Sequence, residues 1–442
     1  MAGRKNKTRS KVHAEPAGSS RRPSADAAAE IGARGRWTAT AAARTAREAR
    51  IATAAHLRTA PIAQQWEITR VMSSYQLWRN HLRDQLCQEQ PRLDPDSPRG
   101  AAILDETAAA LLYGGSGLTP PYPTDLDDAA RRLLDLRAAD LEAATLYVIS
   151  PSMCDVVIAA AQTLTIDDLA LLNDDDLPSP TGMLLLPHPI IVRAVNGNLG
   201  DDRAYVWTSP AQLPSATETG QAVIRPGVRL TTYLDSHGPV RPNSFRDMAT
   251  LAAAQHTPLP LLMPDGTRTT PYLPIITEAM RSALTDLGGH ARAHADRWRE
   301  INTAAGYAEG DQVDDSFEYR PGEEINDHDD LFSIRFLYAF WRLCNQGIAH
   351  LDHIPAGHNA RLLAERAGVS PDVRVTTIRP DTRTTDRPAT ARDWQHRWVV
   401  RMHKVRQWYP SEQRHRVLYR GPYIKGPADK PLLGGEIVRG LR

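Results

Sequence analysis

The chain has 442 residues, with 53 Lys or Arg and 52 Asp or Glu, so its net charge is +1 when histidine is neutral. This length is sufficient for two to four domains with a sizeable core, and 41% hydrophobic and 24% charged residues are ordinary values for globular domains. The three cysteines form no CxxC pair, which argues against a disulfide framework and a structural zinc site. No apolar run approaches the length of a membrane span. We therefore expect a cytoplasmic protein without a cofactor, metal site or membrane partner; its oligomeric state is left open.

The first 36 residues are rich in Arg, Lys, Ala and Ser and contain almost no large apolar side chains. Such a segment cannot bury enough apolar surface to offset the entropy lost on ordering. We therefore expect residues 1–36 to form a disordered basic tail. A tail of this kind can bind phosphate backbones, although a solvated tail is the simpler interpretation.

Residues 37–178 predict a helical domain, because apolar residues such as Trp66 and Val71 recur at three- and four-residue spacing. The expected helices cover residues 38–57, the region from 66 to 86, and residues 126–136, 139–148 and 153–164. Ser152 is expected to cap the last of these helices. The acidic string at 173–176 lacks the glycine and the distal glutamate of a calcium loop. We interpret it as a solvated interdomain turn.

Residues 179–378 predict a mixed α/β domain. Short apolar or alternating runs, split by Pro and Gly, indicate strands at residues 183–186, 190–195, 204–207, 228–234 and 373–378. Helices are expected at residues 275–287 and 293–304, followed by an acidic loop at 311–330.

The clearest helix in the sequence covers residues 331–348, where apolar residues including Trp341 fall on one stripe. Acidic residues precede it and would complement the helix dipole. The histidines that follow, His350, His353 and His358, match no common zinc spacing. We expect surface or capping roles for them.

Residues 379–392 predict a polar linker, and residues 393–442 predict a small basic β-rich module. The expected fold class is therefore α+β: a disordered basic arm, a helical N-terminal region, a mixed α/β middle domain and the C-terminal module.

The basic module carries the strongest functional signal. Between Trp394 and Lys425 there are eight Lys or Arg and one acid, Glu412, together with three His, three Trp and three Tyr. The segment's net charge of +7, in a chain whose total is +1, leaves the remainder net acidic. A concentrated positive charge of this kind is the footprint of a polyanion partner, although a solvated basic strand would look similar.

Two alternating runs within the module predict a hairpin. The first run starts at Trp394, a loop is expected at 407–413, and the second run covers residues 414–420. The hairpin would gather five arginines on one solvated face: Arg397, Arg401, Arg414, Arg416 and Arg420. Trp408, Tyr409 and Tyr423 are expected in loops nearby, where aromatic rings can stack on bases while guanidinium groups pair with phosphates.

Two strings rich in aromatic and basic residues or in Gly and Pro stand out in this segment. The first string contains Trp394, His396, Arg397, Trp398, Val400, His403, Gln407, Trp408, Tyr409, Pro410 and Ser411. The second contains Pro422, Tyr423, Lys425, Gly426, Pro427, Asp429 and Lys430. Together they resemble the carboxyl end of a family of uncharacterised plasmid- and phage-borne proteins, with its W-x-H-R-W, Q-W-Y-P-S and P-Y-x-K-G-P-x-D-K-P-L runs. Where those proteins carry a Gly-His-Trp-Arg string, this chain has Met402, His403, Lys404 and Val405.

The layout is also similar, more distantly, to a mobile-element family that includes an inhibitor of CRISPR-effector synthesis. The first resemblance implies no particular chemistry. The second implies action on RNA during translation.

The leading hypothesis is a non-enzymatic nucleic-acid-binding or regulatory protein of a mobile genetic element. RNA or a single strand is favoured because aromatic residues accompany Arg on strands and loops rather than on a recognition helix. The expected nucleic-acid-binding residues are Arg397, Arg401, Lys404, Arg406, Trp408, Tyr409, Arg414, Arg416, Arg420, Tyr423 and Lys425.

Two alternatives stay open. A metal-independent ribonuclease needs a general base, a general acid and cationic stabilisation of the phosphorane, and these functions are available from His403, His415, Tyr409, Arg406 and Lys425. A scaffold that docks its basic module on an acidic protein is the other alternative, and the acidic loop at 311–330 would offer an intramolecular counterpart. The sequence contains no Walker lysine, nucleophile elbow or dinucleotide fingerprint, which leaves the question of catalysis open.

Overall fold

The computed structural model describes residues 37–442 apart from several gaps. The gaps are residues 90–93, 195–198, 217–221, 239, 242, 273–311, 314–323, 347–348, 379–394, 401–402, 410–413, 421–422, 428–429 and 434–442. The expected tail at 1–36, the linker at 379–392 and the helices at 275–287 and 293–304 therefore lie outside the described residues.

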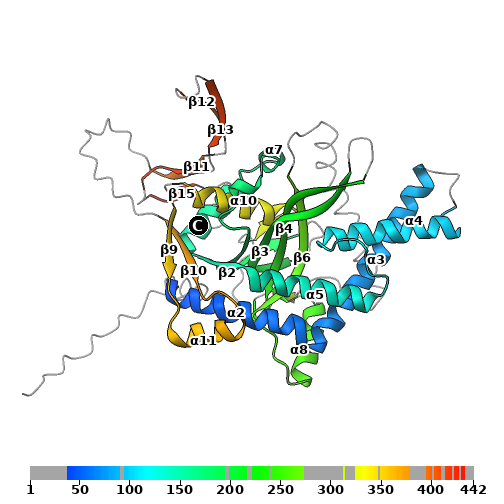
Figure 1. Cartoon of the computed structure of the whole chain (residues 1–442). Coiled ribbons are helices and arrows are strands. Elements are labelled where there is room, and N and C mark those ends of the chain that lie inside the picture. Colours follow the sequence, from blue (N-terminus) through cyan, green and yellow to red (C-terminus); the bar gives the residue numbers. More distant parts are fainter. Residues whose placement is uncertain are drawn as a thin grey trace, which may run out of the picture. The chain divides into compact units, whose positions relative to one another are not determined.

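A mixed eight-stranded sheet forms the centre of the body (Figure 1). Its strand order is β6-β4-β3-β2-β1-β10-β9, and β8 pairs with β2. The bounds are β1 Thr145–Ile149, β2 Thr181–Arg193, β3 Leu199–Ala216, β4 Ala222–Asp235, β6 Leu262–Pro271, β8 Ile325–Asn326, β9 Ala349–Ile354 and β10 Val373–Ile378. β1 runs parallel to both of its neighbours, β2 and β10, whereas β2, β3, β4 and β6 pair antiparallel in succession.

Helices cover both faces of this sheet, and the alternation within β1 shows why. Tyr147 and Ile149 lie in the apolar cluster that contains α6 (Pro151–Ala161) and α10 (Phe332–Cys344). The intervening residues, Leu146 and Val148, lie in the cluster that contains α2 (Ala39–Thr59) and α5 (Leu126–Ala143). A strand that is apolar on both faces needs cover on both, so the body has three layers.

Further elements complete the described body. The further helical segments are α3 Pro61–Glu89, α4 Pro98–Ala109, η1 Ala110–Gly114, α7 Ile166–Leu169, η2 Asp174–Asp176, α8 Asn243–Ala254 and α11 His358–Arg366. The two-residue strands β5 (Val240–Arg241) and β7 (Gln312–Val313) pair with each other.

The predicted α+β class is confirmed, but the expected boundary at residue 178 is wrong. The helix predicted at 139–148 ends with α5 at Ala143, and β1 begins at Thr145. Because β1 pairs with β2 and β10, residues on both sides of position 178 share one sheet and one core. A separate helical domain at 37–178 is therefore not what the chain forms.

Two local predictions are also corrected. Ser150, not Ser152, caps α6, since its Oγ accepts a hydrogen bond from the backbone N–H of Met153 (3.3 Å). Pro151 occupies the first helical position, which makes the residue before it the natural cap. The acidic string at 173–176 is solvated only in part: residues 173–175 are exposed, whereas Asp176 is buried and accepts a hydrogen bond from Arg342 of α10 (2.6 Å).

The helix predicted at 331–348 is confirmed as α10, although it ends earlier than predicted, at Cys344. Its residue Trp341 is fully buried, with its ring centroid 5.6 Å from that of Trp207 on β3. At the helix start, Asp327 Oδ1 accepts hydrogen bonds from the backbone N–H groups of Leu331 and Phe332, both at 3.0 Å. The acidic residue thus satisfies free helix donors and complements the dipole, as the sequence predicts.

Charged side chains are also buried between helices. Glu67 of α3 accepts hydrogen bonds from Arg70, one turn along the same helix, and from Arg137 of α5 (2.8 Å). Glu67 and Arg137 are only 1% and 3% exposed. This buried ion pair therefore links α3 to α5.

Candidate nucleic-acid interface

The basic C-terminal segment forms two small sheets. Their strands are β11 Arg397–Val400, β12 His403–Tyr409, β13 Arg414–Arg420, β14 Tyr423–Lys425 and β15 Leu432–Leu433. β12 and β13 pair antiparallel, whereas β11 lies between β14 and β15 in a three-stranded sheet.

The predicted hairpin is therefore present with a different first strand. β13 pairs with β12, not with the run that begins at Trp394, and the expected loop at 407–413 is strand as far as Tyr409. A connection of four residues, 410–413, suits a direct hairpin between the two neighbouring β-forming runs. Arg397 belongs to the other sheet, and Arg401 lies outside the described residues.

The register of the hairpin decides which residues share a face. Directly paired residues lie on one face, and successive residues alternate. The pairs are His403–Arg420, Lys404–Tyr419, Val405–Leu418, Arg406–Val417, Gln407–Arg416, Trp408–His415 and Tyr409–Arg414.

Two faces follow from these pairs. What we call the arginine face holds His403, Val405, Gln407, Tyr409, Arg414, Arg416, Leu418 and Arg420. What we call the tryptophan face holds Lys404, Arg406, Trp408, His415, Val417 and Tyr419. Three of the five predicted arginines are thus gathered as expected. The neighbours Trp408 and Tyr409 occupy opposite faces, which the prediction of a loop did not anticipate.

The register does not bring the two candidate ribonuclease histidines together. His415 pairs with Trp408, which is five residues along β12 from His403. An odd number of steps assigns the two histidines to opposite faces, about 17 Å apart along the ribbon. A general acid and base pair needs both groups within hydrogen-bond reach of one scissile phosphate, so this register does not itself assemble such a pair from the two histidines.

In the three-stranded sheet, Trp398 and Lys425 form a cross-strand pair. The Lys425 Nζ lies 6.0 Å from the centroid of the Trp398 ring, within cation–π range, and Lys425 is exposed. The Arg397 Nε donates a hydrogen bond to the carbonyl oxygen of Lys430 (2.8 Å), so this arginine has a structural partner. Tyr423 pairs with Val400 at the other end of β14.

Gly426 is required directly after β14. Its φ is +119°, and a Cβ there would lie 2.7 Å from the carbonyl oxygen of His396. Only glycine accepts both the conformation and the close approach, which keeps Lys425 in register with Trp398.

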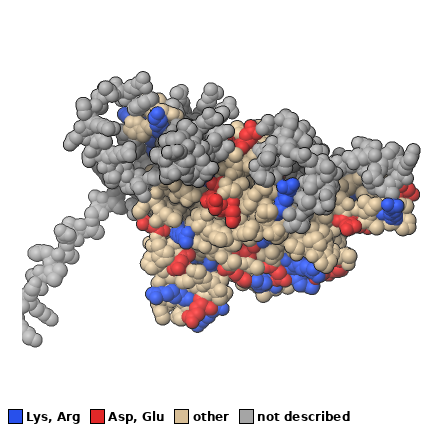
Figure 2. Space-filling model, turned by 45° about the horizontal axis from the view of Figure 1, so that its top comes forward, with Lys and Arg blue, Asp and Glu red and all other residues tan. Residues whose placement is uncertain are grey.

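The described body does not present a comparable concentration of positive charge on the face that Figure 2 shows. Lys and Arg are interspersed there with Asp and Glu. Several of the body's arginines also have acidic partners, such as Arg342 with Asp176 and Arg229 with Asp140.

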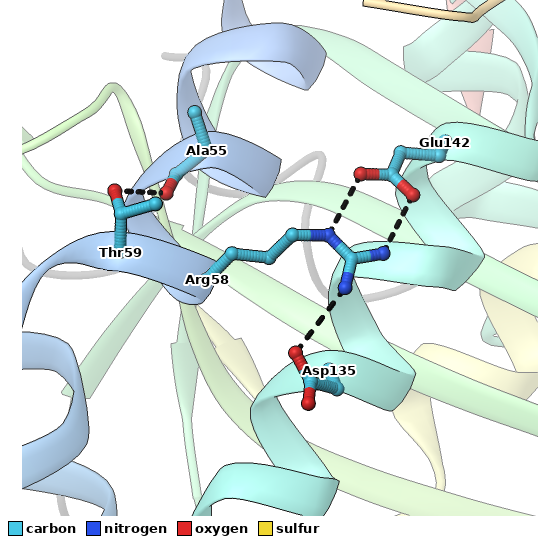
Figure 3. Close-up of polar contacts among 5 residues, drawn as sticks. All are labelled: Ala55, Arg58, Thr59, Asp135 and Glu142. Carbon is cyan, nitrogen blue, oxygen red and sulfur yellow. Dashed lines mark hydrogen bonds and ion pairs between the residues drawn. The ribbon is translucent and has the colours of Figure 1, made fainter.

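A hollow of about 510 Å³ between α2, α5 and the loop after η1 was not anticipated from the sequence. It is lined by Arg58, Leu118, Thr119, Pro123, Arg132, Asp135, Leu136 and Ala139. Arg58 donates to Glu142 (2.9 and 2.7 Å) and Asp135 (3.2 Å), as Figure 3 shows. Arg132 pairs with Asp128 (2.8 Å). An incoming anion would therefore have to compete with carboxylates that both cations already contact.

The histidines after α10 have surface positions, as predicted. His350 pairs with Asp352 (2.9 Å) and His353 with Asp372 (3.1 Å), and all four side chains are substantially exposed. Within the described part of the chain, no group of three or more His, Cys, Asp or Glu is arranged to hold a metal ion. No helix in that part has the length and apolar character needed to span a bilayer.

Comparisons with known proteins add no relative. No family model, no curated protein and no solved structure matches the chain.

Proposed function

We propose that the β12–β13 hairpin binds nucleic acid, with RNA or another single strand favoured over duplex DNA. The observation that carries this proposal is the register, which gathers Arg414, Arg416 and Arg420 on one face of a two-stranded ribbon.

The chemistry of the segment supports a polyanion rather than a single small anion. Arg414 and Arg416 are two residues apart, about 7 Å along the strand, and Arg420 is about 14 Å further on. Such a row is suited to several successive phosphates, each of which a guanidinium group can contact with two hydrogen bonds. Nucleic acid is favoured over an acidic protein because Trp408, Tyr409 and Tyr419 lie among the cations and can stack on bases.

Two further features belong to the proposal. The low cysteine count, three in 442 residues with no CxxC pair, favours a cytoplasmic location, where RNA is abundant. The resemblance to plasmid- and phage-borne proteins favours a regulatory role on a mobile genetic element. Neither the cytoplasmic location nor the regulatory role requires a bound metal.

Salt dependence tests the proposal. If the full chain neutralises about four phosphates of a single strand, log affinity should fall against log salt with a slope near −3. Replacing Arg414 and Arg416 together by Ala should flatten the slope by about 1 to 1.5 and weaken binding to all sequences alike. Fluorescence anisotropy with a labelled oligonucleotide at several salt concentrations measures both quantities.

The matched control replaces Arg44 and Arg366, two exposed arginines of the body, by Ala. It removes the same charge and should leave the slope unchanged. An equal effect of both double variants would mean that net charge, and not the hairpin, determines binding. If the folded wild-type chain binds neither RNA nor DNA at low salt, docking on an acidic protein becomes the better account.

A further inference from the structure

We propose that a bound single strand crosses an edge of the β12–β13 hairpin and contacts both of its faces. The arginine face then takes mainly phosphates, and the tryptophan face takes bases and the adjoining phosphates. This inference rests on the proposed function and specifies how the same strands would engage the ligand.

The first argument is that neither face has the composition of a buried face. A strand face that packs on a core carries a continuous apolar row. The arginine face has only Val405 and Leu418 as aliphatic residues among eight positions, and the tryptophan face has only Val417 among six. Both faces are instead dominated by cations, histidine, glutamine and aromatic residues. The composition of both faces therefore suits contact with a polyanion.

The second argument is the different arrangement of charge and aromatic residues on the two faces. On the arginine face, the only aromatic ring besides histidine is Tyr409, at the end of β12. On the tryptophan face, Trp408 and Tyr419 lie at opposite ends, with Arg406 between them and Lys404 paired with Tyr419. Aromatic platforms that flank cations suit unstacked bases joined by phosphates.

The third argument concerns which nucleic acid can reach both faces. Neighbouring strands are only about 5 Å apart, so the hairpin is a narrow ribbon. A flexible single strand can turn around such an edge within a few nucleotides. A duplex is stiff over about 150 base pairs and, when a ribbon enters its groove, only one face of the ribbon meets the bases. Contacts on both faces therefore select single strands.

The test compares two matched double variants of the full chain. R414A/R416A removes two cations from the arginine face, and K404A/R406A removes two from the tryptophan face. On a 20-nucleotide oligo(U) we expect each pair to flatten the log affinity–log salt slope by about 1 to 1.5 and the four changes together to flatten it by about 2 to 3. Trp408→Ala should weaken oligo(U) binding roughly 5- to 150-fold. On a 20-base-pair duplex only one of the two pairs should matter.

The outcomes separate this inference from the proposed function. If R414A/R416A flattens the slope while K404A/R406A and Trp408→Ala change nothing, the hairpin binds with one face and the two-face contact is wrong. Equal effects of both pairs on the duplex would overturn the selection of single strands. No effect of any variant, or no binding by the wild type, would overturn the proposed function itself.

A charge-preserving variant, K404R/R406K, guards against a folding defect. It should keep the wild-type slope, because both positions stay cationic. If it flattens the slope as K404A/R406A does, charge is not the cause and the two-face contact is overturned.

Discussion

Replacing Trp341 by Ala should lower the free energy of unfolding by about 3–5 kcal/mol. Trp341 is 0% exposed in the last turn of α10, where its ring meets Trp207 of β3 edge to face. Truncation leaves a cavity that the surrounding aromatic residues cannot readily fill, because Trp207 also packs against Tyr147 and Phe340, which contact each other. Urea unfolding of wild type and variant measures the loss.

Trp341→Phe is the control, since it keeps an aromatic ring in the same place and should cost clearly less than the alanine variant. Nucleic-acid binding by either variant, measured where it is still folded, should match the wild type. Unchanged stability together with lost binding would show that α10 contributes to a functional surface and not to the core.

Replacing Glu67 by Ala should lower the free energy of unfolding by a similar amount, about 3–5 kcal/mol. The change leaves the guanidinium group of Arg137, which is 3% exposed, without its carboxylate in the interior. Much of the cost is therefore the penalty of an uncompensated buried charge. The double variant E67A/R137M removes both charges of the buried pair and leaves only Arg70, whose side chain is 23% exposed, so it should recover a large part of the loss. No recovery would show that the ion pair is not the reason for the loss.

The same carboxylate predicts a dependence of stability on pH. Burial alone would raise the pKa of Glu67, but the charges of Arg137 and Arg70 outweigh burial and lower its pKa from 4.5 to about 2. A carboxylate whose pKa is lower in the folded state contributes stability above its unfolded pKa and loses it as pH falls through the folded pKa. Between pH 4.5 and 2, Glu67 should account for a loss on the order of 3 kcal/mol. Glu67→Gln should lose less stability over this window, and an identical pH profile for both proteins would contradict the assignment.

The sequence predicts a helix or strand well where the period of its apolar residues matches the face that the structure buries. The apolar stripe of α10 is of this kind, because a helix with residues such as Leu337 and Trp341 on one face has few alternatives. Strands of the β2–β4 region are likewise predicted, although the observed strands are longer than the apolar runs that identify them. Their polar ends are held by pairing, which no local pattern reveals.

β1 shows why the rest could not be predicted. Its five residues, Thr145–Ile149, are a short apolar run that directly continues the pattern of α5, and such a run fits a helix or a strand equally well. Residues 145–149 form a strand because they pair with β2 and with β10, and β10 lies more than 220 residues away in the sequence. The domain boundary at 178 was wrong for the same reason.

In the candidate interface, alternation within β13 identified residues that share a face, but not the partner strand. Arg397 and Arg414 both follow an alternating pattern, and only the strand register assigns them to different sheets. The same register separates Trp408 from Tyr409. The residues of the candidate interface could therefore be identified from the sequence, whereas their assignment to the two faces of the hairpin could not.

Ultraviolet crosslinking of the folded full chain to a uridine-rich oligonucleotide, followed by mass spectrometry of the crosslinked peptides, tests the central claim most directly. If the β12–β13 hairpin binds nucleic acid, the crosslinks should map to residues 403–420, with Trp408 or Tyr409 among the modified positions, and should disappear in R414A/R416A at moderate salt. Crosslinks confined to residues 37–378, or none at all at low salt, would contradict it.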